Sequence, residues 1–229
     1  RKVFYITGTR ADFGLMKDTL KKLDHDPEIE LQLCITAMHL DEEFGYTAQE
    51  IHQENFKVCA EIPVKLDNKD STSMVTAIGY EIIAMTEVFQ QHKPDIVLLL
   101  GDRGETLAAA IAAAHLNIHL VHIHGGERSG TIDESVRHSI SKFAHYHCTA
   151  TAQSKERLVK MGEKAEHIIV TGAPGLDGLD SMNYIPKSFL FNDLGLDVTL
   201  CNKDTLVLNV TTAGGSYIWQ DGSVSPALL

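Results

Sequence analysis

Short apolar runs with the length of β-strands alternate with helix-like segments along most of this chain, and no other feature restricts its fold as strongly. The strand-like runs are KVFYIT (2–7), LQLCITA (31–37), AEIPV (60–64), DIVLLLG (95–101), IHLVHIH (118–124), CTAT (148–151) and HIIVTG (167–172). Helices are expected from Asp12 to about His25, over 47–53, 73–91, 108–116, 132–147 and 153–162, and briefly after Pro174. This alternation predicts right-handed crossovers and a parallel sheet covered on both faces.

For two of these runs, the sequence also predicts whether the strand is central or at the edge of the sheet. The run at 95–101 is apolar on both faces, as a central parallel strand should be, whereas Pro63 marks 60–64 as an edge strand or a strand end. We therefore predict a doubly wound, Rossmann-like α/β domain over residues 1–182, with ligands at the carboxyl ends of its strands. Residues 183–203 read as a linker, and 204–229 as the start or a fragment of a second domain that is incomplete in this chain.

Composition excludes several classes of partner. The formal net charge is −11, which argues against nucleic acid or an anionic membrane as the main partner. No apolar run approaches the ~20 residues of a membrane span, and the first residues lack the pattern of a secretory signal. The four cysteines are far apart and form no CxxC pair, which favours free thiols in a reducing cytoplasm.

Two polar clusters follow strand-like runs and suggest an anion site. GTRADFG begins with Gly8, where backbone N–H groups at a helix start can approach an anion, and Arg10 adds a forked donor for phosphate. The alternative is a tight turn with a solvated arginine. GDRGET places Asp102 and Arg103 at the tip of the most apolar strand. Here the alternative is a helix-capping aspartate beside a surface arginine.

The stretch HIHGGERSGTIDESVRHSISK (122–142) concentrates titratable groups around a glycine pair. His122 and His124 are two apart on a predicted strand and should share one face. Glu127 follows the glycines, and Asp133 stands at a helix start, where it can also serve as a cap. Carboxylates at different depths can provide one acid and one base. A metal site is less favoured, because no further ligands follow at a recognisable spacing.

Taken together, TGTRADFG, GDR, HIHGGERSGTIDESVRHSISKFAHYH and TGAPGLD resemble the hydrolysing UDP-N-acetylglucosamine 2-epimerases of sialic acid and related nonulosonic acid biosynthesis. The resemblance covers roughly residues 2–182. It implies the GT-B arrangement of two facing α/β domains. It also implies a reaction in which UDP is eliminated across C1–C2 of the sugar and water is added to the glycal intermediate. The products would be UDP and free N-acetylmannosamine or its analogue, formed without a cofactor.

Residue roles follow from the same resemblance. Arg10 and Arg103 match arginines near the diphosphate, and Asp102 and Asp133 match carboxylates required for catalysis. Histidines implicated in activity in some members match His39, His122, His145 and His147. Many members place a catalytic glutamate where this chain has His124, so the resemblance implies that acid–base work passes to His124 or to Glu127.

The resemblance also sets out the alternatives. A second family substrate is UDP-N,N′-diacetylbacillosamine, on the route to legionaminic acid. The family's second domain binds most of the nucleotide and supplies a histidine in an HP motif, which this chain lacks after LVLNV. A non-catalytic nucleotide-sugar-binding half is therefore another reading, and a glycosyltransferase of the same architecture is a fourth. The family often forms homodimers, for which 73–91 is a candidate surface.

Overall fold

The computed structural model describes residues 1–65 and 72–177, together with the backbone of two short strands, Val198–Cys201 (β8) and Thr205–Leu208 (β9). The chain divides into two units, residues 1–178 and 179–229. In the second unit, β8 pairs with β9 in antiparallel register. The predicted boundary at 182 lies outside the described residues, whereas β8 falls within the stretch that we predicted to be a linker.

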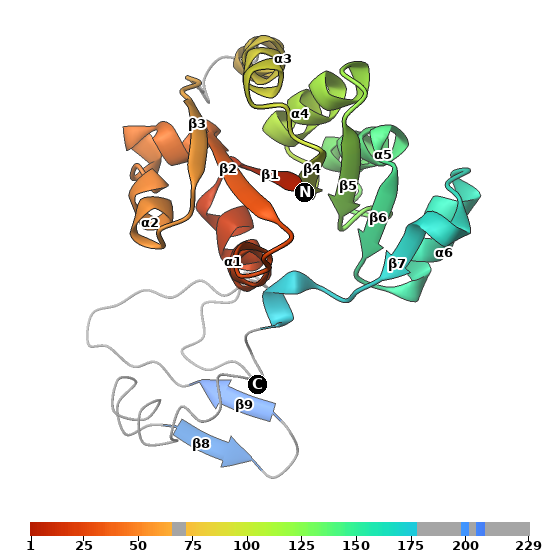
Figure 1. Cartoon of the computed structure of the whole chain (residues 1–229). Coiled ribbons are helices and arrows are strands. Elements are labelled where there is room, and N and C mark those ends of the chain that lie inside the picture. Colours follow the sequence, from red (N-terminus) through yellow and green to blue (C-terminus); the bar gives the residue numbers. More distant parts are fainter. Residues whose placement is uncertain (66–71, 178–197, 202–204, 209–229) are drawn as a thin grey trace. The chain divides into compact units, whose positions relative to one another are not determined.

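The first unit is built on a seven-stranded parallel sheet in the order β3-β2-β1-β4-β5-β6-β7 (Figure 1). Its strands are Lys2–Thr7 (β1), Glu30–Thr36 (β2), Val58–Ile62 (β3), Ile96–Leu100 (β4), His119–Ile123 (β5), Tyr146–Thr149 (β6) and Ile168–Val170 (β7). The order reverses between β1 and β4, which are neighbours in the sheet. Ligands of doubly wound folds bind at such a point, outside the carboxyl ends of the strands.

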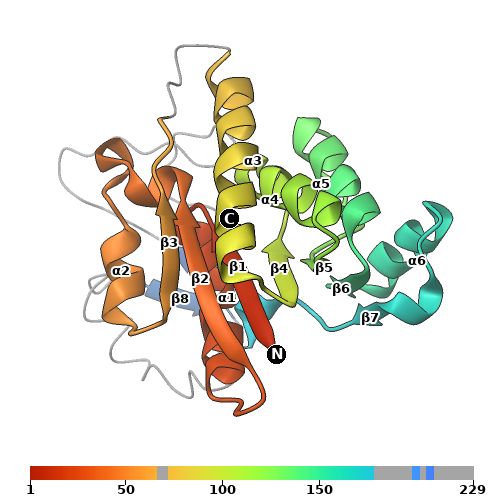
Figure 2. The same cartoon turned by 45° about the horizontal axis from the view of Figure 1, so that its top comes forward.

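Helices connect successive strands, as the alternation predicted. They are Arg10–Asp24 (α1), Ala48–Gln53 (α2), Ser73–His92 (α3), Gly104–His115 (α4), Ile132–Phe143 (α5) and Ala152–Lys160 (α6). Short 3-10 turns cover Ala37–Leu40 (η1), Glu42–Phe44 (η2), Ala165–His167 (η3) and Pro174–Leu176 (η4). In Figure 2, α3, α4 and α5 lie side by side along the sheet. None of the described helices is long and apolar enough to cross a membrane.

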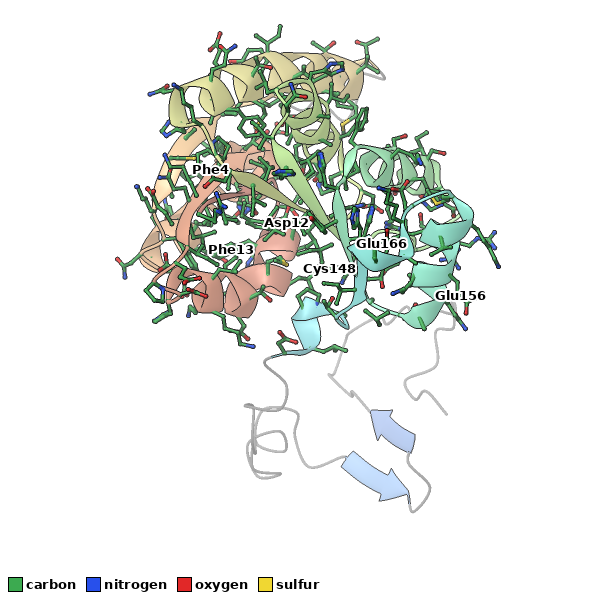
Figure 3. All side chains as sticks on the ribbon, turned by 45° about the vertical axis from the view of Figure 1, so that its right-hand side comes forward. Phe4, Asp12, Phe13, Cys148, Glu156 and Glu166 are labelled. Carbon is green, nitrogen blue, oxygen red and sulfur yellow. The ribbon has the colours of Figure 1, made fainter. Side chains whose placement is uncertain are left out.

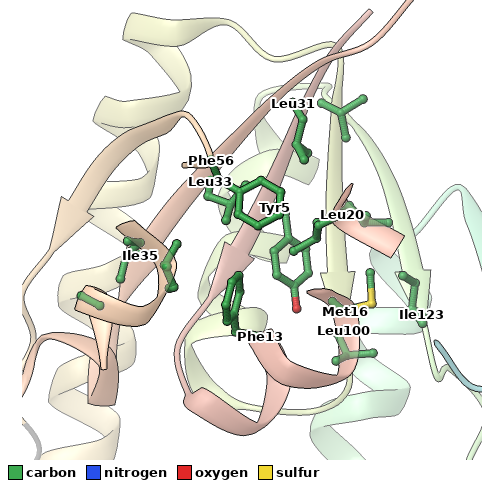
Figure 4. Close-up of a cluster of buried hydrophobic side chains, with 14 residues drawn as sticks. Tyr5, Phe13, Met16, Leu20, Leu31, Leu33, Ile35, Phe56, Leu100 and Ile123 are labelled. Atoms are coloured by element: carbon green, nitrogen blue, oxygen red, sulfur yellow. The ribbon is translucent and has the colours of Figure 1, made fainter. Parts of the chain in front are cut away.

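The core forms two layers because side chains alternate between the faces of each strand. On one face, Tyr5 of β1 clusters with Phe13 and Met16 of α1 (Figure 4). Ile51 of α2 belongs to the same cluster. On the other face, Phe4 packs with residues of α3 and α4, which include Phe89 and a run of small alanines. The central strands are thus buried on both sides, which confirms the prediction for DIVLLLG. The predicted edge position of 60–64 is also confirmed, since β3 ends the sheet.

Two details differ from the sequence prediction. Helix α5 ends at Phe143, four residues before the predicted end, because Ala144 is extended and the chain joins the sheet, where the His145 N–H donates to the Leu120 carbonyl. The prediction that helices cover both faces fails at one edge. Tyr146 and Ile169 lie on the α1 side of β6 and β7, and both remain exposed among the described residues.

Candidate active site

The turn after β4 carries the first pair of candidate residues. Gly101 has a φ of 78°, and its N–H donates to the Ile123 carbonyl at 3.1 Å. Asp102 follows and forms an ion pair with Arg137 of α5. Burial raises the pKa of Asp102, and the nearby Asp133 carboxylate adds to the rise, whereas the cations of Arg137 and Arg103 oppose it. Asp102 is therefore a carboxylate whose charge depends on its two arginines.

His122 fixes that turn from the neighbouring strand. Its ring is buried, and Nε2 lies 2.8 Å from the Gly101 carbonyl oxygen while Nδ1 lies 3.0 Å from the Ser141 hydroxyl. A carbonyl only accepts, so Nε2 carries the hydrogen and Nδ1 accepts from Ser141. Burial lowers the pKa of His122 to about 3. The ring is thus a neutral support for the Asp102 turn.

His124 and Glu127 form the second pair. The prediction that His122 and His124 share one strand face is wrong, because β5 ends at Ile123 and His124 has a left-handed φ of 63°. The His124 Nδ1 lies 4.0 Å from the Glu127 carboxylate, and its buried Nε2 has no hydrogen-bond partner. The His124 ring therefore keeps one buried nitrogen whose hydrogen-bonding capacity no described residue satisfies.

The glycine pair lets this loop pack closely against α6. Gly126 has a φ of 77°, and a Cβ there would overlap the backbone oxygen of Ser154. Arg157 of α6 donates to the Gly126 carbonyl. Farther along, the Glu134 carboxylate accepts from the N–H groups of Ser129 and Gly130 at 3.0 and 2.9 Å. The loop that carries Glu127 is therefore held at both ends.

Asp133 lies in the first turn of α5, where its carboxylate accepts from the Thr131 hydroxyl at 3.0 Å. The Thr131 side chain itself makes no cap hydrogen bond to the helix backbone. Asp133 is exposed and close enough to Asp102 to raise its pKa. The structure thus brings the two carboxylates of the resemblance, Asp102 and Asp133, to one edge of the sheet.

The loop after β1 meets the loop after β2 at the switch point. The Gly8 carbonyl accepts from the His39 N–H at 3.2 Å, and the Gly8 and Thr9 N–H groups both donate to the Asp12 carboxylate at 3.0 Å. Asp12 thereby completes a capping box at the start of α1 (Figure 3). The Gly8 N–H that we expected to approach an anion is therefore already used within the protein.

His39 is buried between two hydroxyl groups. Nε2 lies 3.0 Å from the Thr7 hydroxyl and Nδ1 lies 2.7 Å from the Thr47 hydroxyl. The Thr7 hydroxyl donates to Asp12, so it accepts from His39 Nε2–H. Burial lowers the pKa of His39 to about 4. His39 is a neutral link between the loops after β1 and β2.

Three predicted residues do not join this cluster in the structure. Arg10 begins α1, but its side chain is 73% exposed and pairs with Glu50 at 3.0 Å. His145 lies at the amino end of β6, where Nδ1 accepts from the Leu120 N–H at 3.2 Å and the ring packs against His119. His147 is buried within β6, with Nε2 3.5 Å from Glu163 and Nδ1 unpaired.

Sequence reasoning missed Arg137, Glu105 and Glu81. Arg137 lies on the buried face of α5 with Ile140 and Ser141, so an arginine in phase with apolar residues was the available signal. Glu105 and Glu81 are buried on α4 and α3. Burial raises the pKa of Glu81 to about 7 and that of Asp12 to about 6.

Within residues 1–65 and 72–177, no three His, Cys, Asp or Glu residues gather as metal ligands.

The fold and the position of the candidate site are those of doubly wound α/β proteins that bind nucleotide ligands. Arginines, carboxylates and histidines from the loops after β1, β2, β4 and β5 gather at the carboxyl edge of a doubly wound sheet, which is where such α/β proteins bind nucleotide ligands. The chain belongs to the UDP-N-acetylglucosamine 2-epimerase family, whose model matches residues 21–199.

Two curated relatives show which members of the family the chain is similar to. The chain is 59% identical over 177 residues to a hydrolysing UDP-N,N′-diacetylbacillosamine 2-epimerase of Legionella pneumophila, covering 77% of this chain and 47% of the relative. It is 39% identical over 181 residues to a UDP-N-acetylglucosamine 2-epimerase of Neisseria meningitidis serogroup B. That match covers 79% of this chain and 47% of the relative. The chain thus spans about half the length of these curated relatives.

A solved structure agrees with the fold. The crystal structure of UDP-GlcNAc 2-epimerase from Neisseria meningitidis, bound to UDP-GlcNAc, matches with a TM-score of 0.69 and 27% sequence identity. The match covers 79% of this chain and 48% of that chain. The predicted doubly wound α/β fold is confirmed by this match and by the strand order.

Proposed function

We propose that this chain forms the first α/β half of a hydrolysing UDP-sugar 2-epimerase whose substrate is UDP-N,N′-diacetylbacillosamine. The 59% identity to the Legionella pneumophila relative carries this choice. The sequence alone favoured UDP-N-acetylglucosamine. The comparisons support the alternative better, since the Neisseria meningitidis relative with that name is 39% identical. UDP-N-acetylglucosamine remains the second candidate.

The site offers groups for each step of this reaction. A base removes the C2 proton while the C1–O bond breaks, so UDP leaves and a glycal-like intermediate remains. Water then adds across that double bond, which gives the free 2-epimeric sugar. We assign proton transfer to His124 and Glu127, and stabilisation of positive charge on the sugar to Asp102 and Asp133. Arg103 stabilises the charge that grows on the departing diphosphate.

The test is proton NMR of the full-length protein with either UDP-sugar in D₂O and no acceptor. We expect free UDP and a product that carries deuterium at C2, formed faster from the diacetylated sugar. Faster turnover of UDP-N-acetylglucosamine would reverse the substrate assignment. A requirement for an acceptor would indicate a glycosyltransferase, and binding without turnover a non-catalytic half.

We also infer a homodimer that forms through α3. Val75, Tyr80 and Ile83 are exposed on this helix at 73%, 52% and 63%. Large apolar side chains grouped on one exposed surface are typical of protein contacts. Sedimentation of the protein and of Ile83→Lys tests this inference. A monomeric variant supports it, whereas an unchanged mass for Ile83→Lys would exclude α3 as the contact.

A further inference from the structure

Glu105 lies at the centre of a buried group of charges at the switch point. Its carboxylate pairs with the Arg103 Nε at 2.5 Å, and its side chain is 4% exposed, whereas that of Arg103 is 32% exposed. The pair thus joins a buried carboxylate to a guanidinium that reaches the surface. Both residues lie at the start of α4, directly after the turn that carries Asp102.

Gly8 provides the space that Glu105 occupies. A Cβ on Gly8 would overlap the Glu105 Oε1, and it would also be too close to the Cδ and Cγ atoms at 2.6 Å. β1 and β4 are neighbours in the sheet, so the loop after β1 passes directly over the start of α4. Any larger residue at position 8 would displace the carboxylate that holds Arg103.

The contacts of Arg103 are divided between its two ends. Nε donates to Glu105, and Nη2 lies 3.8 Å from the Met38 sulfur, which is a weak acceptor. A guanidinium carries five N–H donors in a rigid plane, so fixing Nε also fixes the direction of the terminal nitrogens. Forked pairing with phosphate oxygens depends on that direction.

We propose that Glu105 is a positioning residue that aims the terminal nitrogens of Arg103 at the diphosphate of the nucleotide sugar. This inference rests on the proposed function, because it takes the diphosphate as the ligand of Arg103. Glu105 itself does not touch the substrate. It acts through Arg103, and Gly8 is required because Glu105 must fit beneath it.

A double-mutant cycle on UDP affinity, measured by calorimetry on the full-length protein, separates this role from simple packing. Arg103→Ala and Glu105→Ala should each weaken UDP binding by roughly 10-fold. The double variant should be no weaker than Arg103→Ala. If Glu105→Ala weakens binding by the same factor in both backgrounds, Glu105 acts independently of Arg103 and the proposal is wrong.

Conservative variants provide the second measurement. Glu105→Gln keeps an oxygen that accepts from Arg103 Nε, so UDP affinity should stay within about 3-fold of wild type. Gly8→Ala should weaken UDP binding when it is introduced into the wild type. It should have little further effect in the Glu105→Ala background, because the side chain that the new Cβ would meet is then absent. A Gly8→Ala effect of the same size in both backgrounds would contradict the proposed contact.

Glu54→Ala is the matched control. Glu54 is an ion-paired glutamate that contacts Lys17 and Lys21 of α1, so its removal should leave UDP affinity unchanged. A wild-type protein that binds no UDP would refute the proposed function and this inference together. The wild type could instead bind and turn over substrate while the effects of Arg103→Ala and Glu105→Ala on UDP affinity simply add. That result would refute the positioning role of Glu105 and leave the proposed function intact.

Discussion

Arg137 of α5 forms an ion pair with Asp102, and this contact joins a helix face to the turn after β4. Arg137 is almost fully buried, so its charge depends on Asp102 for compensation. The catalytic role that we propose for Asp102 is therefore combined with a role in stability. Substitution of Asp102 alone changes both, and an experiment must separate them.

We expect Asp102→Asn to lower turnover by about 10³-fold and the free energy of unfolding by about 2 kcal/mol, since Arg137 loses its counter-charge. Adding Arg137→Met should restore stability without restoring turnover. Denaturant unfolding and the NMR assay measure the two effects. Full activity in Asp102→Asn would remove Asp102 from the mechanism, and unchanged stability would mean that Arg137 finds another partner.

Substitutions at position 124 test which group transfers the proton. His124→Asn suits the left-handed backbone but cannot exchange a proton, so turnover should fall by roughly 100-fold. His124→Glu supplies another side chain that can exchange a proton, so it should keep more activity than His124→Asn. If His124→Asn keeps wild-type turnover while Glu127→Gln is inactive, proton transfer belongs to Glu127.

The pH dependence of stability should reveal Glu81. Burial raises its pKa to about 7 and Glu105 adds to the rise, whereas the Thr36 hydroxyl and Arg103 lower it. The folded state therefore binds this proton more tightly than the unfolded state. The resulting stabilisation is present below the unfolded pKa of 4.5 and is lost as the pH rises through about 7.

Glu81→Gln is neutral at every pH and should gain roughly 1–3 kcal/mol of unfolding free energy relative to wild type between about pH 5 and about pH 8. Denaturant titrations at several pH values measure this difference. Glu87→Gln, at an exposed position of the same helix, is the control. A difference that does not change with pH would show that Glu81 is ionised throughout.

The rings of His39 and His122 should remain neutral over the working range of the protein. Burial lowers their pKa values to about 4 and about 3, so the unfolded chain takes up these protons first as the pH falls below about 6.5, and stability then decreases. Nitrogen-detected NMR should show the Nε2–H tautomer for both, without change between about pH 5.5 and about pH 8. A titration of the His122 ring in that range would contradict the assignment.

The strands and the carboxyl-edge loops were predictable because each rests on a local pattern. Apolar runs identified β1, β4 and β5, a charged strand end pointed to Asp102, and a helix start together with the family resemblance pointed to Asp133. Arg137 and Glu105 were not predictable in the same way. Their roles depend on which helix face meets which loop, and that is set by packing between segments distant in sequence.

For His145 and His147 the sequence predicted a place in the site that the structure does not give them. The short strand Tyr146–Thr149 contains histidine and tyrosine, so its pattern merges with the end of the preceding helix. Register then decides what the residues do. His147 pairs with His122 inside the sheet, and His145 lies at the amino end of its strand, away from the loops that carry Asp102 and His124.

The separation of sheet and loops has a practical consequence for protein engineering. The buried strands act as a fixed frame, and connections such as 40–46 and 128–131 lie outside the strands at its carboxyl edge. A library that randomises these two connections should yield folded proteins with altered sugar preference. Gly8 and Gly126 should be held constant in it, since each fits against a neighbour that leaves no room for a side chain.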